Sequence, residues 1–598
     1  MNKKESRVFQ RDDIGIDIDV HDRSKWQELQ NPVLNALSQL NALSQLTTSD
    51  HAQSSASSHQ LVTDIPLASE LHFPLQYRHQ QLHSLVVTGQ NIARGEPLVH
   101  SSPDQIDGHN LPGLPSPVDG IVIDCDNQAW QERYITIKPV SAPTDVVQQI
   151  VAKQDRQKQN LPEKKTTPSE IKPAGIDAFD TTSACFWNNP LWLGARSNEK
   201  IKCINDAGIK GHGGGGFSLA SKLGYSIDTL IVNAIECEPL ISCDNALLAN
   251  HAIETMRGIF TLVELSNCKE CIVALGDEDN WQKLFLEEAI SDLHGRATSK
   301  QQASLHSLEK KIRINKVSGS YPLGAESVLV EKLTGFKVKG KRPPVLDGIC
   351  CINIATCHAV DTLSSSGSPP NQRIVTICGD AVAIETGKQS LNVKVYFGTP
   401  IHHLLRCIGI DSADVKLTQG GPLCGTSLQS ADLPIQQHTN CIVVSRQLTE
   451  RMTENCIRCG HCQNVCPVDL LPQELNRFIA AGDTKLAEQL NLKNCLLCGC
   501  CDLVCPSNIP LTNVFRTARQ ALLETQLQHN QALQAEQRYK QRELRLEKRQ
   551  QQRTQKKKER KRVTESASAK KQAISDAISR ARAKTRANDN SGDQQSDN

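Results

Sequence analysis

The chain has 598 residues, which is enough for several domains, each with its own core. Its formal net charge is only +2, but residues 538–562 hold thirteen Lys and Arg against three Glu, a local +10. The remainder therefore carries about −8, the difference between +2 and +10. A nearly neutral total hides a mildly acidic body and a basic tail, which argues against a uniformly basic nucleic-acid binder.

The first residues, "MNKKESRVFQRDD", are charged, and no apolar segment typical of a signal peptide follows them. No run of eighteen apolar residues occurs, so we expect no transmembrane helix and only a peripheral role at a membrane. The 23 cysteines then indicate a reducing compartment. We interpret the clustered ones as metal ligands and not as a disulfide framework.

Residues 1–60 are polar and contain "NALSQL" twice in succession, which predicts a disordered extension, with a short amphipathic helix as the alternative. In residues 61–145, short β-like runs such as "GIVIDCD" and "RYITIKPV" alternate with turn residues. This pattern resembles the barrel-sandwich hybrid of lipoyl and biotinyl carrier domains. The expected hairpin tip, "SPVDG", has no lysine, so we predict a structural module without a carried cofactor. Residues 146–186 are predicted to be a linker.

Residues 187–345 alternate between strand-like runs ("TLIVNAIE", "ECIVALGDE") and a helix-like run ("NALLANHAIETMRGIFTLVEL"). Such alternation predicts a Rossmann-like α/β domain with a parallel sheet. A mixed segment, 346–440, contains the strand-like "RIVTICGDAV" and "LNVKVYFG". Residues 445–515 hold two cysteine clusters, and 516–598 form a basic tail that is either helical or disordered. The predicted fold class is multidomain α/β plus β.

The strongest motif occurs twice, as "CIRCGHCQNVCP" and "CLLCGCCDLVCP". Both have the spacing C-x2-C-x2-C-x3-C-P of bacterial two-cluster ferredoxins, in which the fourth cysteine of each run ligates the other cluster. Paired zinc sites would need two C-x2-C pairs per metal and fit less well. The extra Cys500 lies outside the spacing and is predicted to be unligated. We assign two 4Fe–4S clusters, one to Cys456, Cys459, Cys462 and Cys505, the other to Cys495, Cys498, Cys501 and Cys466.

Two such clusters move single electrons, so a flavin, which accepts two electrons and releases them one at a time, is the natural upstream cofactor. The stretch "GHGGGGFS" matches G-x-G-x-x-G, but a helix-like segment and not a strand precedes it, so the dinucleotide-binding fingerprint is not satisfied. Glycine amides followed by the short helix "SLASKLG" can still cradle a flavin phosphate or a nucleotide diphosphate. A flexible hinge is the alternative.

The motifs "GHGGGGFSLASK", "VNAIECEPLISCD", "YPLGAESVLVEKLTG" and "GGPLCG", followed by the tandem cysteine runs, occur in the order seen in the C subunit of Rnf/Rsx-type electron transport complexes, which the chain resembles. The central region also resembles the flavin- and NADH-binding 51 kDa subunit of respiratory complex I. The resemblance covers roughly residues 64–515. The segment ending in "GGPLCG" resembles a β-grasp (SLBB-type) domain.

This resemblance implies a peripheral subunit on the cytoplasmic side of a complex in the cell inner membrane. Electrons would pass from NADH through FMN and two 4Fe–4S clusters to membrane partners, an iron–sulfur subunit in particular, coupled to ion translocation. A non-catalytic iron–sulfur relay or scaffold with a vestigial flavin site is the alternative. A diaphorase-type subunit of a soluble dehydrogenase or hydrogenase is disfavoured by the lipoyl-like front domain and the C-terminal position of the clusters.

The resemblance also implies roles for single residues. The glycine loop would line the flavin and its phosphate, Lys222 would contact the phosphate, and Glu236 and Glu238 would act beside the flavin and the nicotinamide. The cofactor-binding set is Gly211, Gly213, Gly214, Gly215, Gly216, Lys222, Asn233, Tyr321, Glu326 and Asn353.

Within the loop, His212, Gly215 and Ser218 replace the Leu, Ala and Pro usual in the family. Loss of proline removes a restraint on φ, so we predict weaker flavin binding than in relatives and normal cluster assembly. The basic tail is predicted to be solvated or to contact anionic lipid or an acidic partner. Nucleic acid is not expected as a partner, because no aromatic-bearing binding module accompanies the basic residues.

Overall fold

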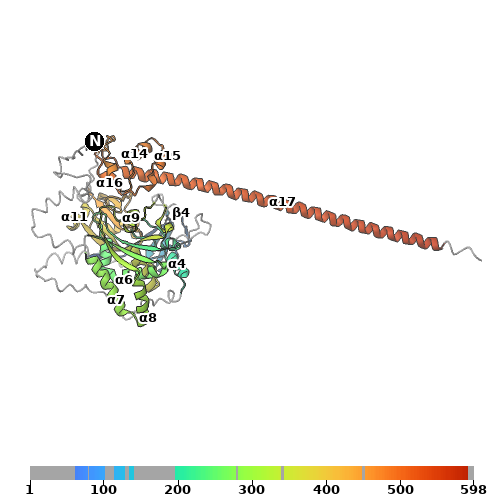
Figure 1. Ribbon diagram of the computed structural model, residues 1–598, viewed down its shortest axis with the longest axis horizontal. Helices are drawn as coiled ribbons and strands as arrows, with labels where there is room; N and C mark the ends of the chain where they lie inside the picture. Colours follow the sequence, from blue (N-terminus) through green and yellow to red (C-terminus); the bar gives the residue numbers. More distant parts are fainter. Residues whose placement is uncertain are drawn as a thin grey trace, which may run out of the picture. The chain divides into compact units, whose positions relative to one another are not determined.

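The computed structural model describes residues 61–77, 80–100, 113–127, 133–140, 195–277, 280–338, 342–446 and 452–589 (Figure 1). The predicted extension 1–60 and the predicted linker 146–186 lie outside these ranges. The chain divides into two compact units, residues 1–516 and 517–598, each of which is described by itself.

A four-stranded parallel sheet, in the order β12-β11-β10-β13, forms the centre of the first unit. Leu230 and Val232 point to one face and Ile231 to the other, and all three side chains are fully buried. Burial on both faces explains why these strands are continuous apolar runs, and it confirms the predicted parallel α/β architecture. The strands are β10 (Thr229–Ala234), β11 (Glu270–Gly276), β12 (Ile312–Val317) and β13 (Ile349–Asn353).

Helices cover both faces of this sheet. Apolar side chains of α4, α5, α6, α7, α8 and α10 join the core on one face, and those of α9 join the core on the other. Figure 1 shows α6, α7 and α8 close together in green. The helices are α4 (Ser197–Asp206), α5 (Leu219–Leu223), α6 (Cys243–Ser266), α7 (Trp281–Arg296), α8 (Ser299–Glu309), α9 (Glu326–Thr334) and α10 (Ile354–Ser366).

The predicted domain boundary at 345/346 falls inside this α/β domain. Strand β13 pairs in parallel with β10, with Thr229 opposite Ile349, and α10 then packs on α6. The run "ICCIN" is short, and its partner strand lies more than a hundred residues earlier in the chain, so local periodicity could not reveal the pairing.

A six-stranded mixed sheet follows, in the order β1-β15-β14-β18-β16-β17. Strand β18 lies beyond the predicted end of this domain at residue 440, and β1 comes from the front of the chain. The strands are β1 (Val62–Asp64), β14 (Gln372–Cys378), β15 (Ser390–Tyr396), β16 (Lys416–Gln419), β17 (Thr426–Ser427) and β18 (Cys441–Ser445). Helices α11 (Asp380–Thr386) and α12 (Ile401–Cys407) join them.

The front β region contains a four-stranded antiparallel sheet in the order β2-β9-β8-β6 and two short two-stranded pairs, β3 with β4 and β5 with β7. It packs closely on the six-stranded sheet, since a Cβ on Gly398 would lie 2.6 Å from the Phe73 ring. Its strands are β2 (Leu71–Pro74), β3 (Gln76–Tyr77), β4 (Gln80–Gln81), β5 (His83–Ser84), β6 (Asn91–Ile92), β7 (Val99–His100), β8 (Gly120–Asn127) and β9 (Tyr134–Pro139).

The cysteine-rich segment is built from short helices: α13 (His461–Asn464), α14 (Pro472–Ala480), α15 (Thr484–Gln489) and α16 (Cys500–Leu503). Helix α17 (Leu511–Asp589) begins here and makes up the described part of the second unit. The basic tail is therefore helical as far as Asp589. Among the described residues, no helix is both long and apolar enough to cross a bilayer.

Candidate functional site

The glycine loop connects α4 to α5 and turns on itself. Lys210 bridges to Ser218, and the amide of Gly211 donates to the Phe217 carbonyl at 2.7 Å. Gly214 has φ +90° and Gly216 has φ +60°, conformations that favour glycine. Residues 213–215 are exposed, so the loop presents backbone without side chains, as a bound phosphate or ring system requires.

The base of the loop is held by His212, whose side chain is buried. Its amide donates to Thr356 Oγ1 at 3.0 Å, and its carbonyl accepts from Arg373 Nη1 at 3.1 Å. Burial lowers the pKa of His212 to about 3, so the ring is neutral at physiological pH. These contacts anchor the loop to α10 and to β14. A flexible hinge, the alternative interpretation of the glycines, would not require such anchoring.

Ser218 does not loosen the loop as the sequence suggested. Its φ is −59°, close to the value that proline would impose, and its Oγ accepts a hydrogen bond from the Ser221 amide at 3.4 Å. Serine therefore keeps the backbone geometry and adds an N-cap to α5.

Asn353, at the junction of β13 and α10, lies directly behind the loop. A Cβ on Gly213 would approach Asn353 Cβ to 3.0 Å, so the glycine permits close packing. Asn353 Oδ1 caps α10 by accepting from the Ala355 amide at 2.9 Å, and Asn353 Nδ2 donates to Asp244 Oδ2 at 2.6 Å.

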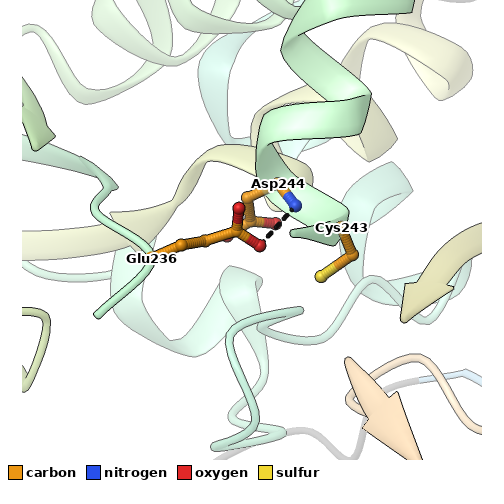
Figure 2. A group of neighbouring side chains, drawn as sticks. All are labelled: Glu236, Cys243 and Asp244. Atoms are coloured by element: carbon orange, nitrogen blue, oxygen red, sulfur yellow. Dashed lines mark hydrogen bonds between the residues drawn. The ribbon is translucent and has the colours of Figure 1, made fainter. Parts of the chain in front are cut away.

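Glu236, Cys243 and Asp244 converge at the N-terminus of α6 (Figure 2). Glu236 Oε1 accepts from the Asp244 amide at 2.8 Å, and Oε2 accepts from the Asn245 amide at 3.0 Å. Burial, with the nearby Asp244 charge, raises the pKa of Glu236 to about 8. Burial also raises the pKa of Asp244. The two neighbouring carboxyl groups therefore favour the protonated form more than free carboxyl groups do.

The same three side chains have ligand atoms within 4.8 Å of one another, a spacing compatible with a metal ion. However, both oxygens of Glu236 already accept backbone hydrogen bonds, and Asp244 accepts from Asn353. The Arg373 guanidinium also interacts electrostatically with Cys243 and Asp244, which opposes a second cation. The contacts are those of a satisfied carboxylate at a helix N-terminus.

Glu238 occupies a second position, next to the "GGPLCG" loop. Its Oε1 contacts the Tyr321 hydroxyl and the Cys424 amide, both at 2.9 Å, and its Oε2 accepts from the Leu423 amide at 3.2 Å. A Cβ on Gly421 would lie 2.2 Å from the Glu238 carboxyl carbon, so only glycine fits there. Burial raises the pKa of Glu238.

Tyr321 connects Glu238 to the cysteine-rich segment. Its hydroxyl lies 2.9 Å from Glu238 Oε1 and 2.7 Å from the carbonyl oxygen of Cys498, so it can donate to only one of them at a time. One side chain of the α/β domain thus reaches the backbone of a predicted cluster ligand.

The remaining predicted residues bind to one another or to the backbone. Lys222 Nζ lies 3.1 Å from Glu326 Oε1 and donates to the Cys351 carbonyl at 2.8 Å. Burial lowers the pKa of Lys222, but the Glu326 carboxylate and the nearby Cys350 and Cys351 together outweigh it, and the net shift is upward. Asn233 Nδ2 donates to the Gly324 carbonyl at 2.9 Å. Two protein groups thus bind the Lys222 ammonium group, which has three donors, and its phosphate contact stays a prediction.

The eight predicted cluster ligands form two groups of four, each around its own pocket. One pocket is lined by Cys456, Cys459, Cys462 and Cys505, and the other by Cys466, Cys495, Cys498 and Cys501. In each group three thiols come from one run and the fourth from the other run, as the predicted assignment requires. Four thiolates around one pocket fit a 4Fe–4S cluster.

Cys500 also lines the second pocket and is buried, and its side chain hydrogen-bonds to Cys498. Its counterpart in the first run is His461, which does not line the first pocket, so a fifth thiol lines only the second.

Sequence reasoning missed Asp244, Arg373 and the amides of Leu423 and Cys424. Ser242 before an apolar run was a signal for a helix N-terminus at Asp244. A charged residue opening the apolar run "RIVTIC" was a signal for Arg373. The backbone donors of residues 423 and 424 carry no sequence signal beyond the glycines around them.

Comparison with known proteins agrees with this geometry. The family described as the Nuo51 FMN-binding domain of complex I matches residues 204–362, and a 4Fe–4S dicluster domain matches residues 452–509. The C subunit of an ion-translocating oxidoreductase complex from Erwinia tasmaniensis is 35% identical over 355 residues, which cover 58% of this chain and 42% of that protein. The aligned part of the chain thus spans less than half the length of that relative.

Two solved structures of an NAD+-reducing [NiFe]-hydrogenase are also similar. The air-oxidised form is 20% identical, covers 49% of this chain and 53% of its own, and has a TM-score of 0.35. The H2-reduced form is 18% identical, covers 55% and 61%, and has a TM-score of 0.37. The sequence matches confirm the predicted resemblance to the Rnf-type C subunit, and the chain carries an FMN-binding domain and a 4Fe–4S dicluster domain.

Proposed function

We propose that this protein is a peripheral subunit of a membrane-bound, ion-translocating electron transport complex, and that it passes electrons from NADH through FMN and two 4Fe–4S clusters to membrane partners. Support comes from the 35% identity to the C subunit of an ion-translocating oxidoreductase complex and from the two matched domains. The physiological electron donor, the side of the membrane and the partner subunits are parts of the proposal.

The observation that carries the proposal is the position of Tyr321. Its hydroxyl contacts Glu238 in the FMN-binding domain and the Cys498 carbonyl in the dicluster domain. A chain with separate functions for its two domains would not need this contact. A redox path between the two domains does need such a contact, because the rate of electron transfer falls steeply with distance.

Bound FMN would accept two electrons as hydride and release them singly. The chain's own residues then have positioning roles. Gly213, Gly214 and Gly215 offer exposed backbone to the cofactor, with Asn353 behind them and His212 fixing the base of the loop. Glu236 and Glu238 accept backbone hydrogen bonds at the first turn of α6 and at the "GGPLCG" loop, which fixes the position of both carboxyl groups.

The basic residues of α17 would contact anionic lipid or an acidic face of a membrane partner. Residues 538–562 carry a local charge of +10 and are exposed in the helix. A salt series separates this role from simple solvation. Attachment to anionic vesicles should weaken with ionic strength and should be lost after truncation at Thr525.

The decisive experiment is anaerobic purification and cluster reconstitution, followed by measurement of bound flavin and its bleaching by NADH. We expect about eight irons per chain, from two 4Fe–4S clusters, and FMN that bleaches on adding NADH. Gly213→Val, whose side chain would meet Asn353, should lose flavin and keep its iron. Leu284→Val, at an exposed position of α7, is the matched control and should keep both the flavin and the iron.

A non-catalytic relay is the second candidate, because the Lys222 ammonium group is engaged by Glu326 and the Cys351 carbonyl. It predicts the same iron content with no flavin and no response to NADH. That result would reject the first candidate.

A further inference from the structure

The two cysteine runs have identical spacing, so their surroundings can be compared position by position, with Cys456 equivalent to Cys495. All residues from 452 to 459 are exposed, whereas in the equivalent stretch 491–498 only Asn491 is. Cys456 and Cys459 are exposed thiols, and their equivalents Cys495 and Cys498 are not. The first pocket therefore faces the surface of this unit, and the second faces protein.

The glycines before the third cysteines show the same asymmetry. Gly460 and Gly499 have nearly equal φ angles, +80° and +79°. A Cβ on Gly460 would have no heavy atom within 4 Å, but a Cβ on Gly499 would lie 2.4 Å from the Leu423 carbonyl oxygen. Only the second run is packed against the "GGPLCG" loop.

That loop leads directly to the α/β domain. The Leu423 and Cys424 amides donate to Glu238, and Tyr321 joins Glu238 to the Cys498 carbonyl. Arg516 Nη2 donates to the Cys424 carbonyl at 2.9 Å and ties the start of α17 to the same loop. The second pocket is thus connected to the α/β domain by side-chain and backbone contacts.

The surface beside the first pocket, residues 452–459, has the character of a transient docking site. Met452 is 86% exposed and Ile457 is 66% exposed. Glu454 and Arg458 carry opposite charges, so this partly apolar stretch has no net charge. Small, partly apolar patches of this kind suit short-lived electron-transfer contacts, which bury less than about 1,200 Å², and methionine is common in adaptable binding surfaces.

We propose that the two clusters act in a fixed order between the FMN-binding domain and a docked protein. The pocket of Cys495, Cys498, Cys501 and Cys466 receives electrons from the FMN-binding domain. The pocket of Cys456, Cys459, Cys462 and Cys505 delivers them to a protein one-electron acceptor that docks on residues 452–459. In each delivery the cluster is oxidised by one electron and the acceptor is reduced by one electron, with no bond broken and no proton moved. The delivery half of this inference needs only the clusters, and the receiving half rests on the function proposed above.

The test uses the full-length, cluster-loaded protein, reduced with dithionite and desalted, so that neither NADH nor flavin is required. The probe acceptor is an oxidised bacterial two-cluster ferredoxin. Two signals are followed: the rate of probe reduction, and the change in amide hydrogen exchange across 452–459 and 491–498 when oxidised probe is added. Ile457→Asp and Met452→Asp are compared with Leu284→Asp, which changes a residue 60% exposed on α7.

We expect the probe to protect 452–459 and not 491–498. Each of the two patch variants should slow probe reduction and weaken binding about tenfold, the effect of losing roughly 1.4 kcal/mol at an interface. Leu284→Asp should match the unaltered protein, and all variants should keep the same iron content. Protection confined to 491–498, or equal rates in all variants of full iron content, would overturn the proposal.

The receiving half is tested by freeze-quench EPR after photoreducing the flavin. The cluster signal altered by Cys500→Ala, which lies in the second pocket, should appear first. The reverse order would overturn this assignment. Failure of NADH to bleach a flavin, with normal probe reduction from dithionite, would reject the proposed function and leave the docking site standing.

Discussion

Replacing Tyr321 with phenylalanine tests the connection between the two redox domains. The change removes one hydroxyl, which lies 2.9 Å from Glu238 Oε1 and 2.7 Å from the Cys498 carbonyl oxygen. Glu238 keeps two backbone donors, from Leu423 and Cys424, whereas the Cys498 carbonyl loses its tyrosine partner. Leaving a partly buried acceptor unpaired costs about 1–3 kcal/mol. Local opening of the 494–502 segment should therefore rise about 5- to 150-fold.

Native-state hydrogen exchange of the cluster-loaded protein measures this opening. Peptides covering 494–502 should exchange faster in Tyr321→Phe, while those covering 452–460 should be unchanged. Tyr225→Phe, at a tyrosine that is 36% exposed, serves as the matched control. Unchanged exchange at 494–502 would mean that the hydroxyl does not hold the two domains together, and it would remove the observation on which the electron path rests.

Three further results are expected. Gly460→Ala and Gly499→Ala both incur the cost of a left-handed backbone, about 1–2 kcal/mol. Only the added methyl group of Gly499→Ala also meets the Leu423 carbonyl, so the melting temperature of this variant should fall further. Equal melting temperatures in the two variants would contradict the packing at Gly499. The folded-state pKa of Glu236 is about 8, above its usual 4.5. The stability that protonated Glu236 contributes is therefore complete below pH 4.5 and is lost as the pH rises to 8. Glu236→Gln cannot ionise and should show a shallower decline of melting temperature over that range. Asp361→Ala breaks a bidentate ion pair with Arg257, whose N–O distances are 2.8 and 2.7 Å. The free energy of unfolding should fall by about 3 kcal/mol, the low end for buried ion pairs, because Arg257 is 28% exposed. A change near zero would show that the packing of α6 on α10 does not depend on this ion pair.

Patterns local in the sequence predicted the local structure well. The apolar runs around Ile231 and Ile272 gave parallel strands, and the spacing of the two cysteine runs matches the grouping of thiols around two pockets. Both signals are contained in a dozen residues or fewer. The pairing of β13 with β10 was missed because strand pairing depends on residues more than a hundred positions apart, and a short apolar run carries no record of its partner.

The candidate site can be divided in the same way, into what a local sequence pattern shows and what depends on distant residues. The roles of single site residues stay predictions, and the contacts of those residues depend on the tertiary structure. The sequence suggested a phosphate contact for Lys222 but could not show that Glu326 and the Cys351 carbonyl lie beside its ammonium group. The sequence suggested a role for Glu236 beside the flavin but could not show that its carboxyl group accepts from two amides at the start of α6. Backbone donors such as that of Leu423 have no residue type of their own, so no sequence pattern could have placed them.

The pairing of β1 with β15 has a consequence for biosynthesis. Val62 lies opposite Asn392, so the partner of β1 is made about 330 residues later. At about 5–20 residues per second, the ribosome needs roughly 16–66 s between making β1 and making β15. Throughout that interval the first strand has no partner, and its edge is open to wrong pairing. A chaperone that binds the nascent chain near residue 62 would protect it for as long as translation lasts.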